Sequence, residues 1–132
     1  MSEYLYDDDT SYVAKDQVDG VLIDPELPPS FDDTPNEERP EAHQKWWDFP
    51  FIRTQTLAEL DAQIAKSQVS TEEKVRWRAE WLKSWPHGTR YDVRCLDGGA
   101  WDRSTGWGMF PTLEEAVRCA KSRRLDALRR LR

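Results

Sequence analysis

Residues 89–117 read "TRYDVRCLDGGAWDRSTGWGMFPTLEEAV", and this stretch decides the fold. Its first residues alternate between apolar and polar side chains, which is typical of a half-buried strand. The "DGG" at 97–99 predicts a hairpin turn into "AWDR", and a second turn at "STG" leads to a short strand, "WGMF". The stretch therefore predicts a small antiparallel sheet, either a hairpin or a three-stranded meander.

About three helices are predicted to pack with this sheet. Each one begins with a Ser or Thr that is followed three residues later by Glu, the pattern of a capping box. The pairs are Thr56 with Glu59, Ser70 with Glu73, and Thr112 with Glu115. Together with the sheet they predict an α+β fold.

The second helix contains "KVRWRAEWLKSW" at residues 74–85. Its apolar arc is wider than the stripe that a surface helix needs, so we expect the helix to be covered on two sides. Trp81 and Trp85 are predicted to lie in the core and to bracket Arg78. Trp77, at the edge of the arc, is a candidate contact residue.

The N-terminal part of the chain is strongly acidic. Residues 1–48 carry fourteen acids and three bases, whereas residues 49–132 carry eleven acids and sixteen bases. We interpret residues 1–44 as an acidic, Pro-rich tail that is largely disordered or orders on a partner. Residues 45–132 are predicted to form a single α+β domain with a basic C-terminal helix, and the aromatic cluster at 46–52 to lie over its core.

Several observations bear on location. The sequence has no apolar run long enough for a membrane span and no basic, apolar leader, so we expect a cytoplasmic protein without a membrane partner. Cys95 and Cys119 are interpreted as buried, reduced thiols. The sequence makes no prediction of oligomeric state.

Residues 91–120 are similar to a recurrent pattern of small bacterial and phage modules. The matching positions are Tyr91, Val93, Gly98, Gly99, Trp101, Phe110, Thr112, Glu115, Ala116 and Ala120. Related patterns occur in sheet-on-helix DNA binders such as AP2-type and integrase arm-type domains. The resemblance supports the strand, turn and helix order and identifies no family.

Residue types that carry out catalysis or bind metals are sparse. His43 and His87 are the two histidines, and Cys95 and Cys119 are too far apart in sequence for the paired ligands of a typical zinc site. Ser84 near His87 lacks a third orienting group, and no glycine-rich phosphate loop is present. We therefore expect no catalytic, metal or cofactor-binding residue, and no enzymatic activity.

The outer face of the predicted hairpin is the candidate binding surface. A two-residue Gly98-Gly99 loop places Arg94 opposite Arg103, and like charges across a ladder are destabilising unless an acid such as Asp92 intervenes. Otherwise this face binds an anion: a phosphate backbone, a partner's acids or the protein's own tail. Its members are Arg90, Arg94, Trp101, Arg103 and Trp107, and the last helix adds Arg123, Arg124, Arg129 and Arg130.

Three hypotheses follow for function. The preferred one is a non-enzymatic regulatory or inhibitory protein that binds another protein, similar in character to the anti-defence or immunity proteins of mobile elements. The alternative is a nucleic-acid-binding protein that uses the Arg/Trp face and the basic helix, with the acidic tail as an internal competitor. An enzyme that the sequence does not reveal is the third.

Overall fold

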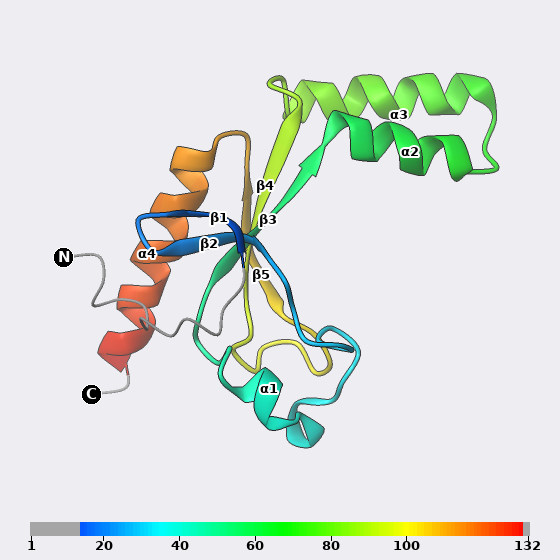
Figure 1. The fold of residues 1–132 in the computed structure, drawn as a ribbon. Helices are drawn as coiled ribbons and strands as arrows, with labels where there is room; N and C mark the ends of the chain where they lie inside the picture. Colours follow the sequence, from blue (N-terminus) through cyan, green and yellow to red (C-terminus); the bar gives the residue numbers. More distant parts are fainter. Residues whose placement is uncertain (1–13, 131–132) are drawn as a thin grey trace.

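The computed structural model describes the backbone of residues 14–130 and the side chains of residues 16–126. This part forms one five-stranded mixed sheet in the order β1-β2-β3-β4-β5, together with four α-helices (Figure 1). The strands are β1 (Ala14–Val18), β2 (Val21–Pro25), β3 (Phe51–Thr56), β4 (Thr89–Cys95) and β5 (Thr105–Phe110). The helices are α1 (Glu41–Gln44), α2 (Leu57–Lys66), α3 (Thr71–Ser84) and α4 (Leu113–Arg130), and η2 (Asn36–Glu38) is a 3-10 helix. The predicted α+β class is confirmed, but the sheet is larger than predicted.

The additional strands β1 and β2 form an antiparallel hairpin at one edge of the sheet. Their turn is Asp19-Gly20, whose φ angles of 51° and 84° are both positive, as a type I′ two-residue turn requires. β2 then buries residues 21–23 in the core. The prediction of a largely disordered segment through residue 44 therefore does not hold for residues 14–44. The first 13 residues of that predicted tail lie outside the described part of the chain.

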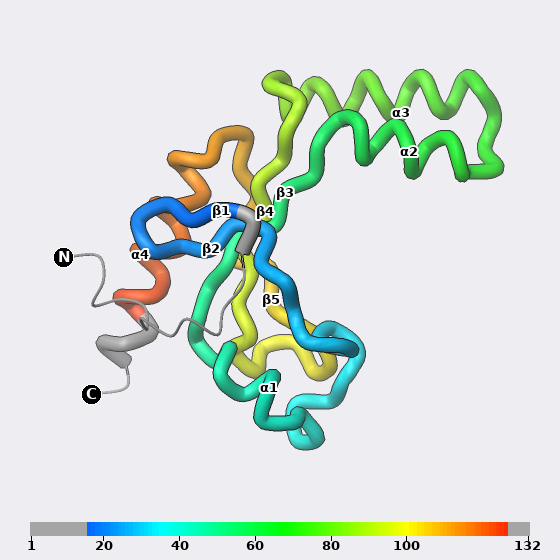
Figure 2. Tube along the Cα trace, viewed as in Figure 1, coloured from blue at the N-terminus to red at the C-terminus, as the bar shows by residue number. Residues whose placement is uncertain are grey.

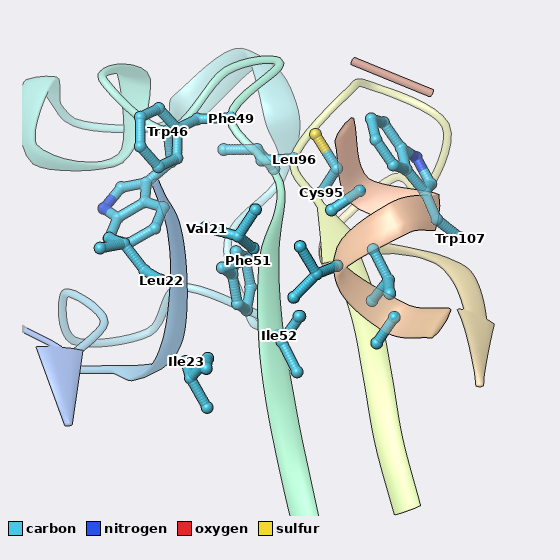
Figure 3. Close-up of a cluster of buried hydrophobic side chains, with 14 of the residues drawn as sticks. Val21, Leu22, Ile23, Trp46, Phe49, Phe51, Ile52, Cys95, Leu96 and Trp107 are labelled. Atoms are coloured by element: carbon cyan, nitrogen blue, oxygen red, sulfur yellow. The ribbon is translucent and has the colours of Figure 1, made fainter. Parts of the chain in front are cut away.

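Strand β2 runs parallel to β3, with Leu22 in register with Phe51. The connection between these strands, residues 26–50, covers the sheet face on which Phe51 lies. The rings of Phe31 and Trp46 meet the Phe51 ring edge-on, with centroids 6.0 and 5.4 Å away. Figure 3 shows Trp46 and Phe49 above this part of the sheet. Trp46 and Phe49 thus lie in the core over the sheet, Trp47 packs partly buried against it, and Phe51 and Ile52 begin the central strand β3 instead of lying over it.

Helix α4 covers the opposite face of the sheet. Val93 on β4 pairs with Gly108 on β5, and a Cβ atom added at Gly108 would lie 3.8 Å from Sγ of Cys119 on α4. The core residues of α4 are Ala116, Val117 and Ala120. Within residues 14–130, no helix combines the length and the apolar character needed to cross a membrane.

Helices α2 and α3 form a hairpin that projects from the end of the sheet, between β3 and β4 (Figures 1 and 2). Both predicted N-caps are present, because Thr56 and Ser70 accept hydrogen bonds from the backbone N–H of Glu59 and Glu73. The prediction that α3 is covered on two sides is wrong, since none of its residues is buried. Trp81 and Trp85 are half-buried rather than core residues.

Arg78 on α3 does not sit between two indoles as predicted. Its Nε donates to Oδ1 of Asp61 on α2 at 2.9 Å. This ion pair joins the two helices of the hairpin, and both side chains remain about half exposed. It therefore contributes about 0–1 kcal/mol to stability.

Candidate functional site

The β4–β5 hairpin differs from the predicted two-residue turn. Cys95 is the last β4 residue in the ladder and pairs with Thr105, so residues 96–104 form a longer loop. The predicted strand "AWDR" lies inside this loop. Arg94 and Arg103 are therefore not cross-strand neighbours, and the predicted repulsion between them does not arise.

The ladder between β4 and β5 shifts register once, at Trp107. Residues 106 and 108 pair with consecutive residues of β4, which leaves Trp107 as the extra residue of a β-bulge. Its side chain is 8% exposed, and its indole N–H donates to Asp97 at 2.9 Å. The guanidinium of Arg123 lies 5.0 Å from the indole centroid and also donates to the Trp107 carbonyl. Trp107 and Arg123 thus form an internal contact between β5 and α4.

The two arginines of β4 also have internal acceptors. Nε of Arg94 donates to Oγ of Ser104 at 2.9 Å, and its Nη2 donates to the Ser104 carbonyl. Ser104 donates in turn, from its backbone N–H and its hydroxyl, to Oδ1 of Asp32. Arg90 pairs with Asp92 at 3.1 Å. Asp92, the acid that the sequence suggested for Arg94, therefore pairs with Arg90, and Arg94 is bonded instead to Ser104, which in turn bonds Asp32.

The nine predicted binding residues do not share one face. Arg94 pairs with Phe51, so the β4 arginines lie on the face covered by residues 26–50, whereas α4 lies on the opposite face. The side chains of Arg129 and Arg130 lie outside the described ones. The nine occupy β4 (Arg90, Arg94), the 96–104 loop (Trp101, Arg103), β5 (Trp107) and α4 (Arg123, Arg124, Arg129, Arg130).

The segment 97–104, here called the Trp101 loop, is held at its start by Asp97. The Asp97 carboxylate accepts hydrogen bonds from the Gly99 N–H at 3.0 Å, the Thr105 hydroxyl at 2.7 Å and the Trp107 indole at 2.9 Å. Burial opposes ionisation of this carboxyl, but the hydrogen bonds from Trp107, Thr105 and Gly99 outweigh burial and lower its pKa. In the sequence, Asp97 is recognisable only as part of the "DGG" turn signal.

Residues 34–36 hold the middle of the Trp101 loop through its backbone. The N–H groups of Thr34 and Asn36 donate to the carbonyls of Asp102 and Trp101, at 3.2 and 2.9 Å. The Asn36 side chain donates to the Ala100 carbonyl at 2.8 Å. Because the carbonyls of three consecutive loop residues are bonded to another segment, the main chain around Trp101 is fixed. Only distant parts of the chain supply these bonds, so local sequence patterns do not reveal them.

The side chain at the centre of this fixed loop points into solvent. Trp101 is 63% exposed, the most of any tryptophan in the described part of the chain. Arg103, also in the loop, is 65% exposed and pairs with Asp102 at 3.4 Å. The loop therefore presents a large aromatic ring beside a cation from a backbone that is already ordered.

A buried polar network holds the segment that anchors the loop. Arg39 is 4% exposed and donates to the Phe31 carbonyl, to Asn36 and to Nδ1 of His43. Because arginine can only donate, Nδ1 of His43 must accept, and His43 Nε2 then carries the proton that is donated to the Pro29 carbonyl at 3.0 Å. Burial lowers the pKa of Arg39, against the attraction of Asp32 and Asp102.

The two cysteine thiols are the groups best suited to nucleophilic catalysis. Cys95 is buried and Cys119 is partly buried. Burial, followed by the negative charges of Asp97 and Asp48, raises the pKa of Cys95, and burial also raises the pKa of Cys119. Neither thiol is therefore present as the nucleophilic thiolate at neutral pH. In the described part of the chain, no group of three or more His, Cys, Asp or Glu side chains is placed to hold a metal ion.

An apolar groove of about 570 Å³ lies elsewhere, between α4 and the β1–β2 turn. Its floor is formed by Val18, Leu113 and Val117. Two ion pairs lie on its rim, Lys121 with Asp19 at 3.6 Å and Arg118 with Glu114 at 3.0 Å. No protein-family model, curated protein or solved structure matches this chain.

Proposed function

We propose that this chain is a non-enzymatic protein that regulates or inhibits another protein by binding it through the Trp101 loop. The observation that carries the proposal is the 63% exposure of Trp101 on a loop whose backbone is bonded to residues 32–36. Tryptophan and arginine are enriched among the residues that dominate binding energy at protein interfaces. Trp101 and Arg103 supply both.

The fixed backbone bears directly on affinity. Association costs free energy for each loop or side chain that must be ordered on binding, and this cost is lower when the loop is already held. Donation from the Thr34 and Asn36 N–H groups to loop carbonyls, and acceptance by Asp97 from the Gly99 N–H, order the Trp101 loop within the free chain. The indole also brings a large contact area with only two rotatable side-chain bonds.

The charge arrangement favours a protein partner over a nucleic acid. A phosphate that approached Arg90, Arg103 or Arg118 would compete with Asp92, Asp102 or Glu114, which already pair with these cations. The whole chain has a net charge of −6, which opposes the approach of a polyanion. Nucleic-acid binding nevertheless remains the alternative that the experiments below distinguish.

The chemistry of the interior supports a binding role rather than catalysis. His43 is 1% exposed with both ring nitrogens hydrogen-bonded, and the Asp97 carboxylate accepts bonds from three donors. Cys95 and Cys119 are protonated free thiols, a state that a reducing compartment maintains. The proposal therefore includes a cytoplasmic setting.

Affinity capture from a lysate of the source organism tests the proposal. The tagged wild-type chain is compared with Trp101→Ser and with Met109→Ser, a control that removes another exposed apolar side chain, 56% exposed on β5. We expect one protein to be retained by the wild type and the control and lost with Trp101→Ser. With that partner purified, calorimetry should show its Kd raised about 30-fold or more by Trp101→Ser.

Two results would overturn the proposal. The first is a partner retained equally by the wild type and Trp101→Ser, which would place the contact elsewhere. The second is binding of a random-sequence DNA or RNA duplex at low salt that weakens steeply as salt rises and is abolished by Arg123→Glu with Arg124→Glu. That second result would support the nucleic-acid alternative.

A further inference from the structure

Helix α3 lacks the packing that a helix of its length normally needs. Isolated helices shorter than about 12–15 residues are marginal in water, and helices in proteins are stabilised mainly by packing of an apolar face. Helix α3 has 14 residues and none of them is buried, while α2 contributes one buried residue, Ile64. Val75 and Trp77 on α3 are 64% and 41% exposed. The hairpin that projects from the sheet in Figure 1 therefore leaves one side of α3 uncovered.

Four charged side chains form a stripe along this uncovered side. They follow one another at spacings of three, four and three residues, which places them within about 80° around the helix axis. The members of this α3 stripe are Glu73, Arg76, Glu80 and Lys83. Arg78, which donates to Asp61 of α2, lies on the opposite side of α3 from the middle of the stripe. The α3 stripe therefore faces away from α2.

The charges of the α3 stripe alternate in sign, and their order is complementary to itself. Two α3 helices placed antiparallel about a twofold axis at position 78 bring Glu73 opposite Lys83 of the other copy. The same axis brings Arg76 opposite Glu80 of the other copy. Every acid then faces a base, whereas a parallel arrangement would place identical charges opposite one another. Glu73 and Arg76 already pair within the helix at 3.0 Å, so the contact extends this pair into an alternating network that both copies share.

The charge of the hairpin also favours a second copy of this chain as the occupant. Residues 57–84 carry five acids and five bases, so the hairpin is neutral within a chain of net charge −6. Two copies can therefore meet there without the repulsion between their remaining acidic surfaces coming into close range.

Trp77 supplies the apolar part of this contact. It borders the α3 stripe, one turn from Glu73 and Glu80. Because Trp77 is one residue from the twofold axis, the two copies of its indole lie on the same side of the contact, about 3 Å apart along the helices. Burial of large aromatic rings dominates interface energetics, whereas exposed ion pairs contribute little by themselves.

We infer that two copies of this chain associate through their α3 helices, antiparallel, with the α3 stripes in contact and the two Trp77 indoles packed together. The two hairpins then form a four-helix arrangement. In it, α3 is covered by α2 on one side and by the other copy on the opposite side. The inference concerns a surface distinct from the Trp101 loop and does not depend on the proposed function.

Sedimentation equilibrium of the full chain tests the association. We expect the wild type to approach the mass of two chains as its concentration rises. Arg76→Glu with Lys83→Glu makes the α3 stripe wholly acidic and should raise the Kd of the dimer about a hundredfold or more, because like charges then face one another. Arg118→Glu with Lys121→Glu is the matched control, which makes the same change of charge on α4 and should leave the Kd unchanged. A wild type that stays monomeric at every concentration, or equal Kd values in the two variants, would overturn the inference.

A mixing experiment separates loss of the contact from loss of the fold. Glu73→Lys with Glu80→Lys makes the α3 stripe wholly basic and should also weaken self-association. An equimolar mixture of the acidic and basic variants should form a dimer, because each acid again faces a base, although neither variant does so alone. A mixture that remains monomeric would contradict the inference.

Discussion

Replacing Asp97 by alanine should release the start of the Trp101 loop. The substitution removes the acceptor of the Gly99, Thr105 and Trp107 hydrogen bonds. Hydrogen bonds to a charged group contribute about 1.5–3 kcal/mol each when buried, and these are only partly buried. We therefore expect a loss of about 2–4 kcal/mol in the free energy of unfolding, or roughly 6–14 °C in Tm. Urea unfolding of the wild type and Asp97→Ala at pH 7 measures this loss of unfolding free energy.

The stabilisation that the ionised Asp97 provides should also depend on pH. The direction of this dependence follows from the lowered pKa of Asp97. A carboxyl with a depressed pKa in the folded state stabilises the fold fully above its unfolded pKa of about 3.9, and this stabilisation is lost as pH falls through the folded value. Asp97→Asn, which keeps the shape without the charge, should thus be less stable than wild type at pH 7, and the difference should shrink as pH falls through the folded pKa of Asp97. A cost for Asp97→Ala under about 0.5 kcal/mol, or a gap for Asp97→Asn that does not change with pH, would refute the reasoning.

Three further substitutions are predicted to have distinct effects on stability in chemical denaturation. His43→Ala should cost about 2–4 kcal/mol, because it leaves Arg39 without one of its buried acceptors; a loss below about 1 kcal/mol would show that the network contributes little. Gly88→Ala should cost about 1 kcal/mol through backbone strain alone, since φ is 81° and no atom lies within 4 Å of an added Cβ. Trp101→Ser should change stability by less than about 0.5 kcal/mol, and a larger loss would mean that the indole packs on the fold.

Short-range signals predicted much of the α+β fold. The caps at Thr56, Ser70 and Thr112 depend on residues three positions apart, and each is present in the structure. The β1–β2 hairpin was missed although Asp19-Gly20 between two valines is a recognisable turn signal. The acidic, Pro-rich composition around it outweighed that signal. The parallel pairing of β2 with β3 has no local signature, because residues 26–50 separate the two strands.

The placement of the candidate surface residues was predictable only in part. Trp101 and Arg103 are exposed in one loop, as the candidate surface required, whereas Trp107 is buried and Arg94 is bonded to Ser104. The error came from reading Gly98-Gly99 as a two-residue turn. Cys95 instead pairs with Thr105, and the ladder contains a bulge at Trp107, whose indole donates to Asp97; a pattern of alternating residues contains neither feature.

The central claim is that the Trp101 loop is ordered before any partner binds. Hydrogen exchange in the free chain tests it most directly, through the backbone amides of Thr34, Asn36 and Ser104, which donate to the loop or to Asp32. We predict exchange about a hundredfold or more slower than in the unfolded chain. Exchange of these amides at unfolded-chain rates, while those of β3 and β4 stay protected, would contradict the claim.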